Sequence, residues 1–240
     1  MKTIFHKAAE RGHVNMGWLD SNHSFSFGHY YDPEKVHFGA LRVLNDDIVH
    51  GGGGFGTHPH DNMEIVSIPL QGDLEHKDST GREAVIRQND VQIMSAGTGI
   101  RHSEKNHSSG VPVNFLQIWI LPKEKDIEPR YDQKTFDPEN RHNKLLTVVA
   151  PDADSAVWIN QDAWFSLGKF DAGKKEVYPV HKQGNGVYVF VLEGSVKIGG
   201  IELNKRDGLG ISETSEIELE TLTNTEILLI DVPMEVSQTL

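Results

Sequence analysis

The chain contains no cysteine among its 240 residues. This absence excludes disulfide bonds, thiolate metal sites and cysteine nucleophiles. The sequence also lacks any apolar run close to the ~20 residues that a membrane-spanning helix needs. Its first twelve residues mix charged and apolar side chains and do not contain the apolar segment of a secretion signal. We therefore expect a cytoplasmic protein that does not bind membranes.

Positive charge is also scarce. The chain has 23 Lys and Arg residues against 35 Asp and Glu residues, and its formal net charge is −12. A surface that neutralises phosphates carries an excess of basic side chains. Direct binding of nucleic acid or of anionic lipid is therefore not expected. Histidine, in contrast, is abundant, with 13 copies.

Long amphipathic helices are missing as well, and none is expected beyond short segments near Pro33 and Ala153. Short β-rich segments recur between turn signals, in two series on either side of the charged stretch 122–143. Strands this short and regular favour a sandwich or barrel, so the expected fold class is all-β. The expected strands are 38–44, 63–70, 84–87, 91–95, 113–121, 145–150, 163–170, 187–192, 195–198, 216–219 and 227–233.

A faint internal repeat divides the chain in two. Leu70–His76 and Leu192–Ile198 both have the pattern of a strand, a glycine turn and a second strand. Reuse of glycine turns by unrelated β-proteins is the alternative explanation. Two copies of one barrel unit explain the pattern more economically. We therefore predict two domains, residues 1–135 and residues 136–240.

The most informative segment is the glycine-rich stretch that ends in His58-Pro59-His60. Side chains of a strand alternate between faces, so His58 and His60 point the same way, about 6 to 7 Å apart along the chain. Pro59 cannot donate a ladder hydrogen bond, which places the segment at the start or the edge of a strand. The two imidazoles can then bind one ion.

The same one-residue skip separates His102 from Glu104. Three imidazoles and one carboxylate, from His58, His60, His102 and Glu104, form a mixed nitrogen and oxygen set. Such a set suits iron(II), nickel(II), copper(II), cobalt(II), manganese(II) or zinc(II), and not calcium. One pair of histidines alone could be surface decoration, but two matched pairs argue against that. We expect one divalent transition metal per chain, with iron(II) as the first expectation.

Two sets of residues compete for roles at this site. Glu64 also lies at an even offset from His60, but four residues of extended chain span ~13 Å, so Glu104 is preferred as the fourth ligand. His107 could support the site from behind, although a surface turn is the preferred interpretation. The histidines without a matched partner pattern are expected to be solvated or hydrogen-bonded; they are His6, His13, His23, His29, His37, His50, His76, His107, His142 and His181.

Several further segments form a recognisable series: Gly17–Asp20, His23–Phe27, Tyr30–Pro33, Leu41–Asp47 and Asp73–Ser79. Together with the two metal-ligand pairs they resemble the pirin family, bicupins that include bacterial quercetin 2,3-dioxygenases. The resemblance is strong over residues 12–121 and thin thereafter. It implies two double-stranded β-helix barrels in one chain. It also places the family's metal ligands on His58, His60, His102 and Glu104.

The chain departs from the family pattern at two places. Asp61–Glu64 stands where the family commonly has an Arg-Gly-Phe-Glu run, so the shape of the pocket is expected to differ. In the second half, His181 and Gln183 stand where a functional cupin has two histidines, and no histidine follows them. The resemblance therefore implies a second cupin domain without a metal site.

The activity that the resemblance implies is that of a metal-dependent dioxygenase, which cleaves a flavonol-like enolic substrate with O2. Glu104 would then be the catalytic base that takes the substrate's hydroxyl proton. Strand placement suggests Phe38, Met63, Ile93 and Phe115 as flanking residues, although ordinary core packing is the preferred interpretation for each of them. Two other functions stay open: a metal-bound regulatory or redox-sensing module with a protein partner, and a cupin that acts on another enolic metabolite.

Overall fold

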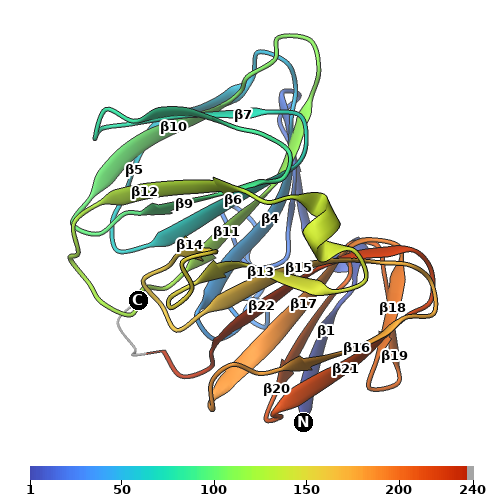
Figure 1. Cartoon of the computed structure of the whole chain (residues 1–240). Helices are drawn as coiled ribbons and strands as arrows, with labels where there is room; N and C mark the ends of the chain where they lie inside the picture. The colour runs from blue at the N-terminus through green and yellow to red at the C-terminus, as the bar shows by residue number, and fades with distance from the viewer. Residues whose placement is uncertain (237–240) are drawn as a thin grey trace.

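The computed structural model describes residues 1–236 as four sheets, antiparallel except for the pair of β13 and β14, arranged as two barrels (Figure 1). The large sheet of the first barrel runs, from edge to edge, through β12 (Arg130–Thr135), β9 (Asp90–Ser95), β6 (Glu64–Gln71), β11 (Val113–Ile120), β4 (Leu41–Val49), β3 (Leu19–His23) and β2 (Gly12–Asn15). Its small sheet runs through β5 (Gly54–His60), β10 (Ile100–Asn106), β7 (Leu74–Asp78) and β8 (Glu83–Ile86).

The second barrel repeats this architecture. Its large sheet contains β1 (Lys2–His6), β20 (Gly208–Ser212), β17 (Asn185–Glu193), β22 (Thr225–Pro233), β15 (Trp164–Phe170), β13 (Leu145–Ala150) and β14 (Val157–Trp158). Its small sheet contains β16 (Lys175–Pro179), β21 (Glu216–Thr221), β18 (Ser195–Ile198) and β19 (Ile201–Asn204). The prediction of an all-β bicupin is confirmed.

Corresponding strands occupy the same places in the two barrels, which accounts for the faint sequence repeat. Strand β6 leads into β7 through Gly72, as β17 leads into β18 through Gly194. Both glycines have a positive φ, +74° and +78°, and an added Cβ would lie 2.9 and 2.1 Å from a backbone oxygen. The turn therefore requires glycine in both copies.

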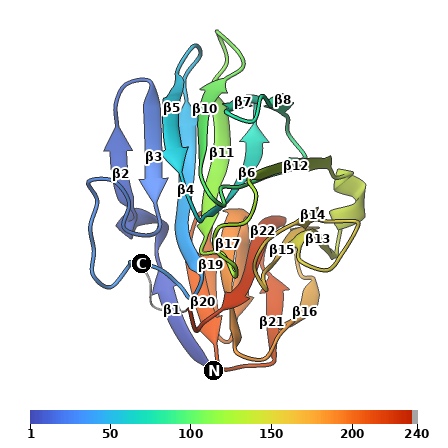
Figure 2. The same cartoon turned by 90° about the vertical axis from the view of Figure 1, so that its left-hand side faces the viewer.

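Strand β1 pairs with β20, so the first strand of the chain belongs to the large sheet of the second barrel (Figure 2). It occupies the edge that β12 occupies in the first barrel. The division at residue 135 stays a prediction, with the addition that residues 2–6 are hydrogen-bonded to the second half.

The two large sheets pack against each other and bury the main hydrophobic core. Strand alternation explains this packing. In β6, Val66 and Ile68 face the other sheet, whereas Ile65 and Ser67 face the interior of their own barrel. Strands that are covered on both faces are buried along almost their whole length, which is why they form recognisable apolar runs in the sequence.

Helical structure is limited, within residues 1–236, to two 3-10 helices at Ala8–Glu10 and Pro138–Arg141. The segments near Pro33 and Ala153, for which short helices were considered, form turns. No helix in the described part of the chain is long and apolar enough to cross a membrane.

Candidate metal centre

His58 and His60 lie on β5, the edge strand of the small sheet of the first barrel. The edge position predicted from Pro59 is confirmed by the strand order. Both histidines are half-buried, whereas Thr57 and Pro59 are exposed. The two imidazoles therefore face the barrel interior and remain close to its mouth.

His102 and Glu104 lie on the adjacent strand β10, and both are only 2% exposed. Arg101 and Lys105, next to them in sequence, are exposed. This alternation confirms that His102 and Glu104 share one face, as their spacing predicts. His102 is directly opposite His58 in the antiparallel ladder, so the two imidazoles meet across the strands.

The three predicted histidines converge. One ligand atom from each of His58, His60 and His102 lies within 4.8 Å of the others. Their ring centroids are separated by 4.5, 4.8 and 4.9 Å. Glu104 is placed beside this trio and groups with His102, not with His58 or His60.

The carboxylate of Glu104 is bound from below by the large sheet. Ser67 Oγ donates to its Oε1 at 3.1 Å, and Gln117 Nε2 donates to its Oε2 at 2.6 Å. Burial raises the pKa of Glu104 to about 7, and the two hydrogen bonds oppose that rise. Ser67 and Gln117 were not singled out from the sequence, because their contact with Glu104 depends on the packing of two sheets.

The charge state and hydrogen bonds of the imidazoles fit a divalent ion. Burial lowers the pKa of His102 to about 2 and that of His60 to about 4, so both rings are neutral. His58 Nδ1 donates to the carbonyl of Gly56 at 2.8 Å, which leaves the lone pair on Nε2. Both nitrogens of His102 are buried without a hydrogen-bond partner in residues 1–236. Neutral imidazoles with free lone pairs are the donor set that a transition metal binds.

His76 is a member of the cluster that the sequence interpretation set aside. It lies on β7, is fully buried, and has one ligand atom within 4.8 Å of ligand atoms of His102 and Glu104. The pattern His76-x-Asp78 repeats the skip of His102-x-Glu104, and the two pairs face each other in the ladder. The skip was visible in the sequence, but the pairing of β7 with β10 was not.

The residues suggested to flank the site divide into two groups. Phe115 lies in the core inside the first barrel, and Met63 packs near Trp119. The suggestion for Phe38 and Ile93 is wrong, because both lie in the core between the barrels. The side chain of Ile93 lies on the face of β9 that is turned away from the interior of the first barrel.

Trp119 is an aromatic neighbour of the site that the sequence did not reveal. Its ring meets the ring of His60 edge-to-face, at 4.9 Å between centroids. Phe27 meets Trp119 in the same way at 5.3 Å. Trp119 and Phe27 are both half-buried, so they form an aromatic wall beside the imidazoles.

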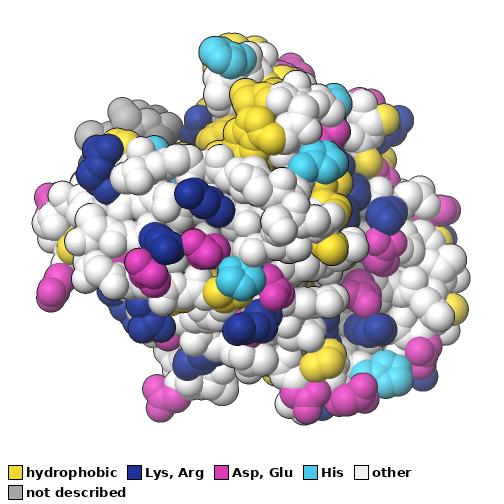
Figure 3. Space-filling model, turned by 90° about the horizontal axis from the view of Figure 1, so that it is seen from above, with side chains coloured by type: hydrophobic (Ala, Val, Ile, Leu, Met, Phe, Trp, Pro, Cys, Tyr) yellow, Lys and Arg dark blue, Asp and Glu magenta, His cyan; other side chains and the backbone are white. Residues whose placement is uncertain are grey.

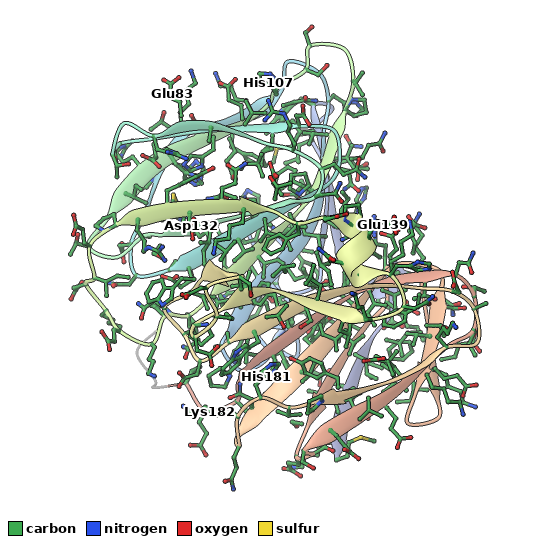
Figure 4. All side chains as sticks on the ribbon, in the orientation of Figure 1. Glu83, His107, Asp132, Glu139, His181 and Lys182 are labelled. Carbon is green, nitrogen blue, oxygen red and sulfur yellow. The ribbon has the colours of Figure 1, made fainter. Side chains whose placement is uncertain are left out.

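Two competing residues lie elsewhere. The carboxylate of Glu64 accepts hydrogen bonds from Ser95 Oγ at 2.8 Å and from the backbone N–H of Asn160 at 3.1 Å, so it faces the second barrel. His107 is exposed at the rim of the first barrel (Figure 4). Its Nδ1 lies 3.4 Å from a carboxylate oxygen of Glu75. On the face seen in Figure 3, Lys and Arg side chains are interspersed with Asp and Glu.

The corresponding positions of the second barrel carry no such cluster. His76 faces Glu104 in the first barrel, and after alignment of the glycine turns Ile198 faces Leu219 in the second. The same registers match the four predicted ligand positions to other residues of the second barrel, namely Tyr178, Val180, Ile217 and Leu219.

His181 and Gln183 therefore do not occupy the ligand positions to which the family pattern had assigned them. His181 follows the end of β16 and stacks on Trp164 at 4.8 Å between ring centroids. Its Nδ1 lies 3.1 Å from Asp231 (Figure 4). The family pattern was matched to this part of the sequence a few residues away from the true positions, because the pairing of β16 with β21 is not visible in the sequence.

A two-barrel chain with converging imidazoles in one barrel defines a bicupin with a single candidate metal centre. Residues 4–120 match the family model described as Pirin, and residues 147–232 match that of the quercetinase C-terminal cupin domain. The chain belongs to the pirin family. It is 44% identical over 228 residues to quercetin 2,3-dioxygenase of Escherichia coli, covering 95% of this chain and 97% of that protein.

Solved structures agree with this assignment. The crystal structure of YhhW from Escherichia coli superposes with a TM-score of 0.93 at 42% identity and covers 99% of this chain and 100% of that one. The same bacterial pirin has been solved in complex with nickel(II), with a TM-score of 0.91, 42% identity and coverage of 97% and 99%. The nickel complex and the His and Glu cluster of this chain support a single transition metal. The names of these relatives support a dioxygenase-like function for a metal-dependent cupin.

Proposed function

We propose that His58, His60, His102 and Glu104 hold one divalent metal ion, with iron(II) as the first choice. The observation that carries this proposal is the convergence of three imidazoles, among them a buried His102 with both ring nitrogens unpartnered within residues 1–236. A buried polar atom without a partner costs about 1 to 3 kcal/mol, which an ion at this place would remove.

We propose further that the chain is a dioxygenase that cleaves a flavonol-like enolic substrate with O2. A bound ion supplies a Lewis acid with open coordination positions beside the protein ligands. His58 and His60 leave the site open toward the barrel mouth, since both are half-buried. Trp119 and Phe27 offer an aromatic surface for a flat ring. The relative named quercetin 2,3-dioxygenase supports this substrate class.

Glu104 is the residue that we propose as general base. Its carboxylate is fixed by Ser67 and Gln117, so it is oriented before any substrate arrives. A positioned carboxylate within hydrogen-bond reach can take the hydroxyl proton of an enol.

Oxygen consumption tests this function. The purified chain, loaded in turn with iron(II) and nickel(II), is given quercetin and a panel of other enediols while dissolved O2 is recorded. We expect metal-dependent uptake of O2 with at least one flavonol. Uptake only with a non-flavonol enediol would replace the substrate class. No uptake with any of them, from protein that holds its metal, would favour the regulatory protein-binding function. A cytoplasmic location stays a prediction.

A further inference from the structure

His76 is a buried histidine next to the proposed ligands, yet it has no role among them. Its ring is fully buried between two neighbours, 5.3 Å from the ring of His102 and 4.9 Å from the ring of Tyr131. It projects from β7 toward the same interior face as Glu104, its direct ladder partner on β10. Burial of an imidazole at this place therefore needs an explanation.

The hydrogen bonds of His76 fix its tautomer. Its Nε2 lies 2.9 Å from Oδ2 of Asp78, and a carboxylate only accepts, so Nε2 carries the proton. The lone pair is then on Nδ1, which is buried and has no hydrogen-bond partner among the described residues. An imidazole that donates one N–H to a carboxylate and leaves its other nitrogen free has the arrangement of a metal-ligating histidine.

His76 belongs to a second group of three possible ligand residues. Ligand atoms of His76, His102 and Glu104 lie within 4.8 Å of one another, and all three residues are buried. The outer group instead contains the half-buried His58 and His60. His102 belongs to both groups, and both of its ring nitrogens are free of partners within residues 1–236.

We propose that His76 is a ligand-bearing residue of the metal centre. The centre then has two overlapping positions for one ion: the outer position of the proposed function, where His58, His60 and His102 converge beside Glu104, and an inner position formed by His76, His102 and Glu104. This inference rests on the proposed function only in placing a divalent ion in the first barrel. The inner position has no half-exposed ligand, so an ion there is shielded from solvent and substrate. The outer position is open to both.

Nickel(II) binding to the purified full-length chain tests the inner position. The variant His58→Ala/His60→Ala changes only residues of β5 and keeps the three residues of the inner position, which lie on β7 and β10. We therefore expect it to retain nickel with weakened affinity. X-ray absorption of this variant should then detect two imidazole ligands. Adding His76→Gln to it should abolish binding. In the otherwise wild-type chain, where the outer position remains, His76→Gln should lower nickel affinity less than it does in the His58→Ala/His60→Ala chain.

His181→Gln is the matched control, because His181 is also a histidine paired with a buried carboxylate, that of Asp231, but in the second barrel. It should leave nickel affinity unchanged. The inner position is ruled out if the folded His58→Ala/His60→Ala chain binds no nickel while the wild-type chain does. That result leaves the outer centre intact. Loss of the metal centre as a whole would instead be seen as wild-type protein that binds no nickel.

Discussion

The two barrels share one strand order but differ in what fills them. The interior of the second barrel is an apolar cluster of valine, leucine and isoleucine with one tyrosine. The interior of the first barrel has two small apolar clusters together with buried imidazoles, carboxyls, amides and hydroxyls. The same backbone architecture therefore folds around either filling.

The difference is sharpest along one ladder row of the large sheets. In the first barrel, five polar residues on adjacent strands are directly paired in one row, which we call the polar row: Gln92, Ser67, Gln117, Asn45 and His23. All five are buried, and two of them hold Glu104. Because directly paired residues share a face, the whole polar row faces the interior of the first barrel, where the candidate metal centre lies.

The equivalent row of the second barrel is Leu209, Val189, Leu229, Ser166 and Thr147. Three of its five members are aliphatic. A buried polar group costs free energy unless it is hydrogen-bonded, so a row selected for stability alone would be apolar, as it largely is in the second barrel. The polar row is thus attributable to the site above it and not to the fold.

The largest effect should come from His102→Ala, because His102 belongs to both ligand groups. We expect the metal content to fall from one ion per chain to near zero while the circular dichroism spectrum remains that of a β-protein. Metal is measured by elemental analysis after dialysis against chelator-free buffer. The comparison between barrels breaks if His181→Ala removes metal as well, or if His102→Ala retains a full ion.

Glu104→Gln should have the next largest effect. An ion held by three imidazoles survives the loss of a fourth ligand, so most of the metal should remain. Loss of a positioned base should lower flavonol turnover by roughly 10²-fold or more. Higher pH should partly restore turnover, because the substrate then ionises unaided. Turnover at the wild-type rate with metal retained would show that Glu104 is not the base.

An exchange between equivalent rows tests whether polarity serves the fold. Both amide atoms of Gln92 lack a hydrogen-bond partner in the described chain, so Gln92→Leu should leave the free energy of unfolding unchanged or raise it by about 1 kcal/mol. Leu209→Gln, at the equivalent position, should lower it by about 2 to 3 kcal/mol. Urea denaturation of metal-free protein measures both. Equal destabilisation by the two variants would mean that the polar row also supports folding.

Local sequence patterns were sufficient for most strands and for the convergence of three histidines. Strands β6, β11 and β22 are buried on both faces, so their apolar runs are evident without knowledge of their neighbours. His58, His60, His102 and Glu104 were found because alternation within a strand is a local property.

Features that depend on partners distant in sequence were missed. Strand β20 contains Gly208 and Gly210, which resemble turn residues, but an added Cβ would lie 2.2 Å from Tyr188 and 2.6 Å from Phe38. The glycines therefore permit close packing of large rings against a strand. His76 and strand β1 were missed for the same reason, since each is defined by the strand with which it pairs.

The smallest effect concerns the pH dependence of stability and depends on Asp47. This residue lies two residues along β4 from Asn45 of the polar row, so the two side chains share a face. Asp47 is 3% exposed and accepts a hydrogen bond from Ser21 Oγ, and burial raises its pKa to about 7 from 3.8. Its equivalent in the second barrel is Gly168, which cannot titrate. Any contribution of this position to pH dependence therefore comes from the first barrel alone.

The sign follows from proton binding. Between pH 4 and pH 7 the native carboxyl of Asp47 keeps a proton that the unfolded chain has lost, so the free energy of unfolding falls as pH rises. The slope is at most about 1.4 kcal/mol per pH unit, and the loss persists above pH 7. Burial lowers the pKa of His23 to about 4, which gives an opposite slope between pH 4 and 6.5. Asp47→Asn should remove only the falling term that Asp47 contributes, so metal-free variant protein should gain stability relative to wild type as pH rises to 7. Urea denaturation at pH 5, 6, 7 and 8 measures the difference, with Ser166→Ala as the control from the second barrel. A difference that does not change with pH would show that Asp47 is ionised in the native state throughout this range.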